Sequence, residues 1–225
     1  MIHKLSRNDV SELTGIAVPE IAEHDRDEMA IPSYAHSNPL IRWLMWRRYE
    51  TIAQFAQPSK TMSVLEFGCG IGLFLPTLAE RYGTVYAIDL YPQYAELLAR
   101  RMDLPVRFVP TLDSVPDGTL DAVVAADVLE HVEDLPDWVR TFHAKLKPGG
   151  TMLVSGPTEN WLYRLGRFVA GFSDKADYHH TNIDRIKKVF EENGFVTTRK
   201  KSLPMAVAPA LFKVLRFERQ TPPDP

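Results

Sequence analysis

The chain has 225 residues, 45% of them hydrophobic, and a formal net charge of −3 at pH 7. This length allows one substantial core, so we expect one domain with extensions. The slight negative charge excludes a domain-wide basic field, and we therefore expect no nucleic acid partner. Because Cys69 is the one cysteine, the chain can form neither an internal disulfide nor a cysteine-based zinc cluster.

Two missing signals indicate where the protein works. Residues 1–8 contain no apolar segment of the kind found in a signal peptide. No apolar run approaches the roughly 18 residues that a membrane-spanning helix needs. We expect a cytoplasmic protein, and the single cysteine fits a reducing compartment.

The first part of the chain is predicted to be an arm followed by one helix. Residues 1–37 are mixed and polar, and we expect an irregular or short-helical N-terminal arm. Asn38 and Pro39 mark a helix start, and the helix runs to Gln57. It combines tryptophans and leucines with interleaved arginines. This content fits either a lid or substrate helix at 38–57 or a face that contacts a membrane surface.

From residue 63 onward, predicted strands and helices alternate. We expect strands at 63–67, 84–88, 106–109, 120–126, 151–155 and 195–201, and helices at 72–82, 92–102, 135–146 and 181–193. The alternation predicts an α/β fold with a doubly wound, mostly parallel sheet. We expect this domain to span 38–203, with a C-terminal tail at 204–225.

The stretch from Val64 to Gly72 carries the most specific motif. It reads E-x-G-x-G-x-G, a buried strand followed by a glycine turn, and Asp89 ends the next strand. Glycines let a backbone approach a ligand closely, and a carboxylate at Asp89 suits two ribose hydroxyls. A dinucleotide site would need G-x-G-x-x-G, but position 73 is Leu. Glu66 suits an ammonium and a sulfonium better than a pyrophosphate.

This run resembles motif I of the class I S-adenosylmethionine-dependent methyltransferases, and Asp89 matches their acidic residue after strand two. The segments Leu120–Val132 and Leu146–Gly150 are similar to later motifs of the same superfamily. The resemblance covers about residues 38–201. It is greatest to small-molecule, lipid-quinone and sugar methyltransferases whose strand-four motif ends in Leu-Glu-His. It implies a seven-stranded Rossmann-like sheet with an N-terminal helical extension, and S-adenosyl-L-methionine as the cofactor.

The resemblance assigns the cofactor-binding residues position by position. They are Glu66, Gly68, Cys69, Gly70, Gly72, Asp89, Leu90, Thr111, Leu112 and Asp127. One departure concerns the adenine amino group, which family members often bind with an Asp after strand three. Here Thr111 takes that position, so either Asp113 substitutes or Thr111 and the Leu112 N–H bind the adenine. Leu90 and Tyr91 either pack on the adenine or belong to the core.

Polar residues follow the strand at 120–126. Asp127, Glu130 and His131 stand at i, i+3 and i+4, so they share one face if the segment is helical. His131 is suited to remove a proton from an acceptor hydroxyl near pH 7. Two alternatives stay open: the three residues bind a divalent cation, or they only hydrogen-bond the loop. We assign His131 and Asp127 as catalytic and assign no metal.

These features predict an S-adenosylmethionine-dependent methyltransferase that methylates an oxygen of a small-molecule, sugar or lipid-linked acceptor. The alternative is a non-catalytic S-adenosylmethionine-binding partner protein. Arg164 and Arg167 are candidates for an anionic head group, and the loop at 177–180 is a candidate for acceptor contact. The residues from 203 to 217 mix apolar and basic side chains. For this segment, as for the helix at 38–57, packing in the core is the preferred interpretation, and peripheral contact with the inner membrane surface is the alternative.

Overall fold

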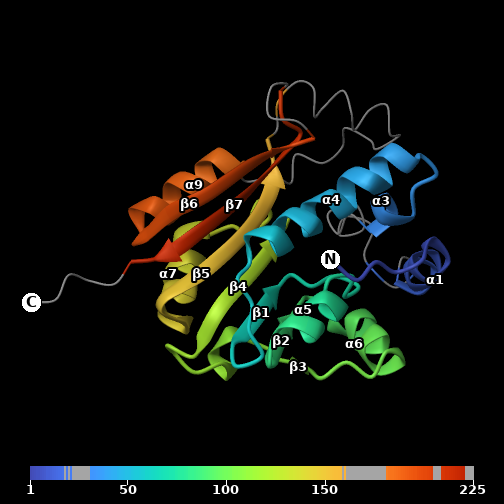
Figure 1. The fold of residues 1–225 in the computed structure, drawn as a ribbon, viewed down its shortest axis with the longest axis horizontal. Coiled ribbons are helices and arrows are strands. Elements are labelled where there is room, and N and C mark those ends of the chain that lie inside the picture. Colours follow the sequence, from blue (N-terminus) through green and yellow to red (C-terminus); the bar gives the residue numbers. More distant parts are fainter. Residues whose placement is uncertain are drawn as a thin grey trace, which may run out of the picture.

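The computed structural model describes residues 1–17, 19, 21, 31–158, 160, 181–204 and 209–220. Its centre is a seven-stranded sheet with the order β3-β2-β1-β4-β5-β7-β6 (Figure 1). The strands are β1 (Ser63–Phe67), β2 (Thr84–Ile88), β3 (Val106–Phe108), β4 (Leu120–Ala126), β5 (Leu146–Pro157), β6 (Phe195–Leu203) and β7 (Phe212–Arg219). The predicted seven-stranded, mostly parallel sheet is thus confirmed.

The first five strands pair in parallel, whereas β7 runs antiparallel to both β5 and β6. Successive strands are added from β1 toward β3 on one side and from β4 toward the other edge on the opposite side, and β1 and β4 are neighbours. In open α/β sheets, ligands bind beyond the carboxyl ends of strands at such a switch point. The order of strands therefore places a binding site beyond β1 and β4.

Strand β7 corrects the expected boundary at residue 203. Residues 212–219 were expected to be a tail, but they pair with β5 from Thr151 to Pro157. Val214, Leu215 and Phe217 are buried, and Lys213 and Arg216 alternate with them. The mixture of apolar and basic residues therefore serves a buried strand, and it leaves no membrane-facing tail at these positions.

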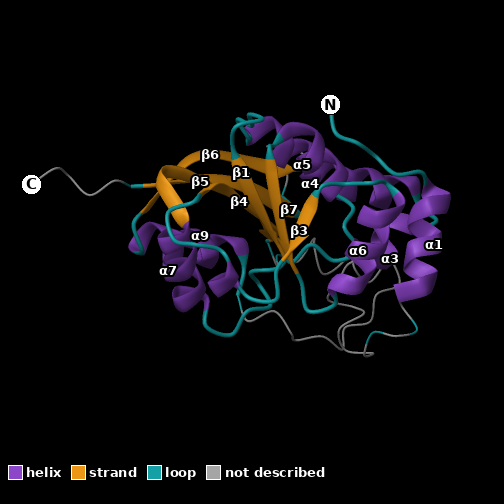
Figure 2. Ribbon diagram, turned by 90° about the horizontal axis from the view of Figure 1, so that it is seen from below, coloured by secondary structure: helices purple, strands orange, loops and turns teal. Residues whose placement is uncertain are grey.

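Helices cover both faces of the sheet (Figure 2). One face carries α4 (Pro39–Phe55), α5 (Leu75–Arg81) and α6 (Pro92–Arg101), and the other carries α7 (Leu135–Lys145) and α9 (Ile183–Glu192). Each face has its own apolar core, because successive strand residues point to opposite sides. Val64 belongs to the first core, and Leu65 and Phe67 belong to the second.

Helix α4 begins where the sequence indicates. The Asn38 side chain caps it by accepting a hydrogen bond from the Leu40 N–H at 2.9 Å, and Pro39 follows as the first helical residue. Trp46 and Ile52 are buried against the sheet, so most of α4 is a core helix. Trp43 and Leu40 are exposed near its start. The face available to a membrane is therefore limited to the first turns of α4 and excludes Trp46.

The N-terminal arm contributes α1 (Arg7–Ala17) and α3 (Ile31–Ala35). Val10, Leu13 and Tyr34 are buried in the same core as α4. A short 3-10 helix, η1, spans Leu112–Ser114. Within the described ranges, no helix is both long and apolar enough to cross a membrane.

Strand β5 starts earlier than predicted. Residues 147–150 were expected to be a turn before a strand at 151, but β5 begins at Leu146. Leu120 pairs with Leu146, and the register shifts before Ala122 pairs with Thr151. Gly149, with φ at 73°, lies inside this irregular stretch. The Lys-Pro-Gly-Gly run therefore interrupts the pairing of β4 with β5 and shifts its register.

Candidate functional site

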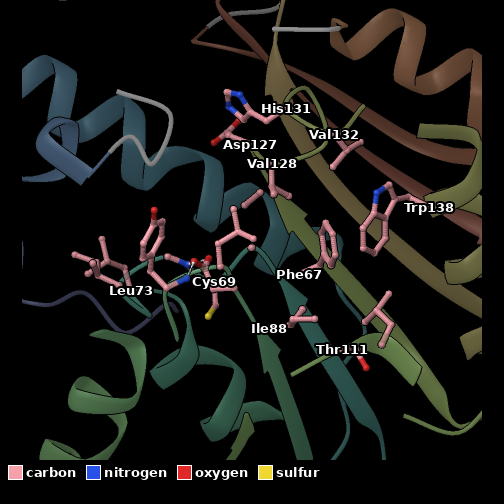
Figure 3. Close-up of a pocket in the computed structure, with 18 of the residues that line it drawn as sticks. Phe67, Cys69, Leu73, Ile88, Thr111, Asp127, Val128, His131, Val132 and Trp138 are labelled. Atoms are coloured by element: carbon pink, nitrogen blue, oxygen red, sulfur yellow. Dashed lines mark hydrogen bonds between the residues drawn. The ribbon is translucent and has the colours of Figure 1, made fainter. Parts of the chain in front are cut away.

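A cavity of about 580 Å³ opens at the carboxyl ends of β1, β2 and β4 (Figure 3). Its lining includes the glycine turn after β1, Asp89 after β2, the segment after β3, and Asp127 and His131 after β4. Helix α4 supplies Arg48 and Tyr49 to its wall. Figure 3 shows Thr111 at the far end of this cavity from Asp127 and His131.

The glycine turn has the backbone that its sequence predicts. Gly68, Gly70 and Gly72 all have positive φ, at 72°, 55° and 83°. A Cβ on Gly68 would lie 2.5 Å from a methyl group of Val128, so a side chain there would disrupt the packing. A Cβ on Gly70 would meet nothing within 4 Å. Gly68 therefore serves the packing of the loop, whereas Gly70 leaves open space at the cavity.

Asp89 lies where the sequence places it, at the end of β2. Its Oδ2 accepts a hydrogen bond from the Gly70 N–H at 2.7 Å, and its Oδ1 accepts one from the Tyr91 N–H at 2.9 Å. Burial raises the pKa of this carboxyl, although its backbone hydrogen bonds act in the opposite direction. Each carboxylate oxygen has a further lone pair, so Asp89 can also accept two ligand hydroxyls.

Glu66 and Cys69 lie deeper than the other predicted cofactor residues. Glu66 is 1% exposed and is not part of the cavity surface. Burial, followed by repulsion from Asp89, raises its pKa well above the usual range. Cys69 lines the cavity, its thiol is buried, and its N–H donates to the Ile88 carbonyl at 3.2 Å. The Cys69 amide is thus already used in joining the turn to β2.

The residues expected at the adenine end border the cavity, and both alternatives for the adenine contact remain predictions. Thr111, Leu112 and Asp113 all line the cavity. Leu90 is 89% exposed, which is unusual for a leucine, and it also lines the cavity together with Tyr91. An exposed apolar side chain at the mouth of a cavity is available for contact with a flat apolar ligand.

The segment after β4 differs from the expected helical turn. Residues 127–131 form a turn in which the His131 N–H donates to the Val128 carbonyl at 3.2 Å, and Asp127 has φ at 54°. Asp127 and His131 line the cavity, but Glu130 is buried away from it, beside Gly156. The prediction of one shared face is therefore wrong, because the left-handed residue Asp127 ends the strand without starting a helix.

The shape of this turn also concerns the alternative in which Asp127, Glu130 and His131 bind a divalent cation. Across the described parts of the chain, no group of three His, Cys, Asp or Glu side chains is arranged to hold a metal ion. Arg164, Arg167 and the loop at 177–180 lie outside the described residues.

Arg48 is the main site residue that sequence reasoning missed. It is 2% exposed, and its guanidinium forms an ion pair with Asp127, whose Oδ1 also accepts a hydrogen bond from Ser155 Oγ at 3.1 Å. Arg48 Nη2 donates to the Tyr34 hydroxyl at 3.3 Å. Its guanidinium carbon lies 4.6 Å from the ring centre of Phe212.

The position of Arg48 on the buried face of α4 was the one available signal. Two arginines of the same helix, Arg42 and Arg47, are less buried. The partners of Arg48 are far away in sequence, so no local pattern identifies them.

Known proteins with similar sequences identify the family. Residues 40–200 match the family described as "Methyltransferase domain". The chain is 31% identical over 165 residues to a ubiquinone biosynthesis O-methyltransferase of Methylobacterium nodulans, covering 65% of this chain and 66% of that protein. It is 35% identical over 105 residues to a protein of the same name from Methylocella silvestris, covering 44% and 41%. The chain thus spans between two fifths and two thirds of these curated relatives.

Solved structures agree on the fold. The N-methyltransferase NodS of Bradyrhizobium japonicum, in complex with S-adenosyl-l-homocysteine, has a TM-score of 0.63 and 19% identity, covering 87% of this chain and 96% of that one. The YcgJ protein of Bacillus subtilis has a TM-score of 0.63 and 16% identity, covering 79% and 100%. With the family match, these results confirm the expected family and its cofactor, S-adenosylmethionine. The chain belongs to the class I S-adenosylmethionine-dependent methyltransferases.

Proposed function

We propose that this protein transfers a methyl group from S-adenosylmethionine to an oxygen of a small-molecule, sugar or lipid-linked acceptor. One observation carries the proposal. A single cavity joins the glycine turn and Asp89 at one end to Asp127 and His131 at the other. A cofactor site and a candidate base thus share one open cavity.

The residues of the first end fit the cofactor. The space over Gly70 is open, and the Asp89 carboxylate can accept ribose hydroxyls while holding the turn. Gly68, Cys69 and Gly72 shape the turn, Leu90, Thr111 and Leu112 border the adenine end, and Glu66 lies below it. When bound, S-adenosylmethionine supplies a methyl group already activated by its sulfonium. The protein then contributes mainly alignment and exclusion of water.

His131 is the proposed base at the other end. A hydroxyl acceptor must lose its proton as the oxygen attacks, and histidine is suited to accept a proton near neutral pH. Asp127 is held by Arg48 and Ser155, so its carboxylate has a fixed orientation in the cavity wall. We assign Asp127 a role in orienting the acceptor or the methionine part of the cofactor.

The acceptor class rests on similarity and on one exposed surface. Relatives that are 31% and 35% identical are named O-methyltransferases of ubiquinone biosynthesis, which favours oxygen as the methylated atom. Leu40 and Trp43, exposed near the start of α4, stand beside Arg42. Such a set suits the interface of an anionic membrane. We propose a cytoplasmic protein that reaches a partly apolar acceptor at the inner membrane surface.

Transfer of labelled methyl groups from S-adenosylmethionine tests the activity. Cell extract is separated into lipid and aqueous fractions, and each is incubated with wild type, His131→Ala and Asp89→Ala. Label is expected in one fraction, with His131→Ala reducing turnover by roughly 10²-fold or more at nearly unchanged cofactor affinity. A protein that binds cofactor but labels neither fraction would point to the non-catalytic alternative.

The membrane part is tested separately. Wild type should sediment with anionic liposomes at low salt, and Leu40→Ser/Trp43→Ser should not, because these side chains are exposed. Trp46→Ser would be a poor choice, since Trp46 is buried in the core. Equal behaviour of the two proteins would remove membrane contact from the proposal and leave the methyltransferase activity intact.

A further inference from the structure

Two carboxyl groups flank the glycine turn, and only one of them is satisfied. Asp89 accepts hydrogen bonds from two backbone N–H groups. Glu66, in β1, is 1% exposed, and its Oε2 has no hydrogen-bond partner among the described residues. Glu66 stands between Ala87 of β2 and Val124 of β4, in the middle of the sheet. A buried polar atom without a partner is costly, so its presence here calls for a functional explanation.

The groups that face Glu66 offer it no positive charge within the described part of the chain. Burial raises the pKa of Glu66, and repulsion from Asp89 raises it further. Burial raises the pKa of Tyr49, on α4, and that of Cys69, in the turn, and repulsion from Glu66 adds to both shifts. Arg48 is the cation in the same wall, and it forms its ion pair with Asp127. An ionised Glu66 would thus be a buried charge facing acidic neighbours.

A sulfonium in the cavity would change the balance between the protonated and the ionised form of Glu66. Cys69, Tyr49 and Asp89 all line the cavity, so a ligand in the cavity lies across these residues from Glu66. A fixed positive charge placed there favours the carboxylate over the carboxylic acid, because opposite charges attract strongly in a poorly solvated site. The product, S-adenosylhomocysteine, has a neutral thioether at the same position.

We propose that Glu66 holds a proton in the cofactor-free protein and releases it when a ligand with a sulfonium enters the cavity. This inference rests on the proposed function, in that it requires S-adenosylmethionine to bind. The O–H bond of the carboxylic acid breaks, the proton passes to the buffer, and the carboxylate remains beside the sulfonium. After methyl transfer the sulfonium charge is gone, so Glu66 takes a proton back. The cavity then favours the cofactor over the spent product.

Calorimetry can count the released proton directly. S-adenosylmethionine and S-adenosylhomocysteine are each titrated into wild type at one pH, in two buffers with different ionisation enthalpies. The buffer dependence of the heat should correspond to up to one more proton released with S-adenosylmethionine than with S-adenosylhomocysteine, since the α-ammonium group is common to both ligands. Glu66→Gln should abolish this difference, because the amide cannot ionise. Glu50→Gln, a partly buried glutamate of α4 outside the cavity, is the matched control and should keep it.

Two outcomes would overturn the inference. One is equal proton release with both ligands, and the other is full release in a folded Glu66→Gln. If Glu66→Gln does not fold, the pH dependence of wild type decides. Affinity for S-adenosylmethionine should rise with pH by up to about tenfold per unit and then level off, while affinity for S-adenosylhomocysteine should change little. A protein that binds neither ligand would instead refute the proposed function.

Discussion

The two ends of the cavity are built in different ways. The cofactor end comes from short contiguous motifs, namely the turn at 68–72 and the residues just after β2 and β3. The other end is assembled from distant segments, where Arg48 of α4 meets Tyr34 of α3, Asp127 after β4 and Phe212 of β7. The family match spans 40–200, so Tyr34 and Phe212 lie outside it. The end with the glycine turn is thus encoded locally, whereas the proposed acceptor end also depends on segments that flank the family domain.

This comparison predicts opposite phenotypes for mutations at the two ends. Gly70→Val should abolish measurable binding of S-adenosylhomocysteine, because the side chain fills open space at the cavity. The fold should survive, since a Cβ at Gly70 meets nothing within 4 Å and a non-glycine residue at positive φ costs about 1–2 kcal/mol. Calorimetry and thermal unfolding measure the two effects. Loss of the fold together with binding would show that the turn is structural as well.

Arg48→Met should have the opposite phenotype, in which the fold is affected. The free energy of unfolding should fall by about 3–5 kcal/mol, because the substitution leaves the partly buried Asp127 carboxylate without its cation. Urea unfolding measures this loss. The double variant Arg48→Met/Asp127→Asn should recover part of the stability, since it removes the uncompensated charge as well. A single variant as stable as wild type would show that the ion pair contributes little to the link between α4 and β4.

Asp89→Ala should weaken cofactor binding by about 1.5–3 kcal/mol, the range for removing a hydrogen-bonding charged group. The Gly70 and Tyr91 amides also lose their acceptor, so part of the effect comes from a less ordered turn. Asp89→Asn is the control that keeps an acceptor oxygen, and it should lose less. Unchanged affinity in a folded Asp89→Ala protein would argue against ribose binding at this position.

The smallest expected effect is on the pH dependence of the free energy of unfolding. The folded-state pKa of Glu66 is raised, so between about pH 4.3 and that raised pKa the folded protein binds more protons than the unfolded chain. The free energy of unfolding should therefore fall as pH rises through this window, by at most about 1.4 kcal/mol per unit from this group. Urea unfolding between pH 5 and 8 measures the slope. Glu66→Gln should flatten it, and an unchanged slope would assign the effect to other groups.

The sequence predicts the elements around the cofactor end closely. The bounds of β1, β2 and β4 agree with the expected ranges, since each strand is an apolar run ended by a charged or glycine residue. Strand β7 escaped prediction because its mixture of apolar and basic residues also fits a surface segment, and because nothing local shows that it pairs with β5 as well as with the preceding β6.

The end of the cavity with Asp127 and His131 was predicted only in part for a related reason. Spacing alone placed Asp127, Glu130 and His131 on one helical face, but the positive φ of Asp127 sends the backbone into a turn. Periodicity placed Arg48 on a helix without revealing that its side chain meets Asp127, 79 positions later. Local patterns contain no information about such long-range pairs.

The place of β7 also matters for how the protein is made. It is the last strand that the structure describes along the sequence, yet it lies between β5 and β6, and within the sheet β6 pairs with β7 alone. During synthesis, one edge of β5 stays unpaired until residue 219 leaves the ribosome. An unpaired strand edge can pair with other chains. A chain that ended before residue 212 would thus keep every residue assigned to the cofactor and have an unfinished sheet prone to aggregate.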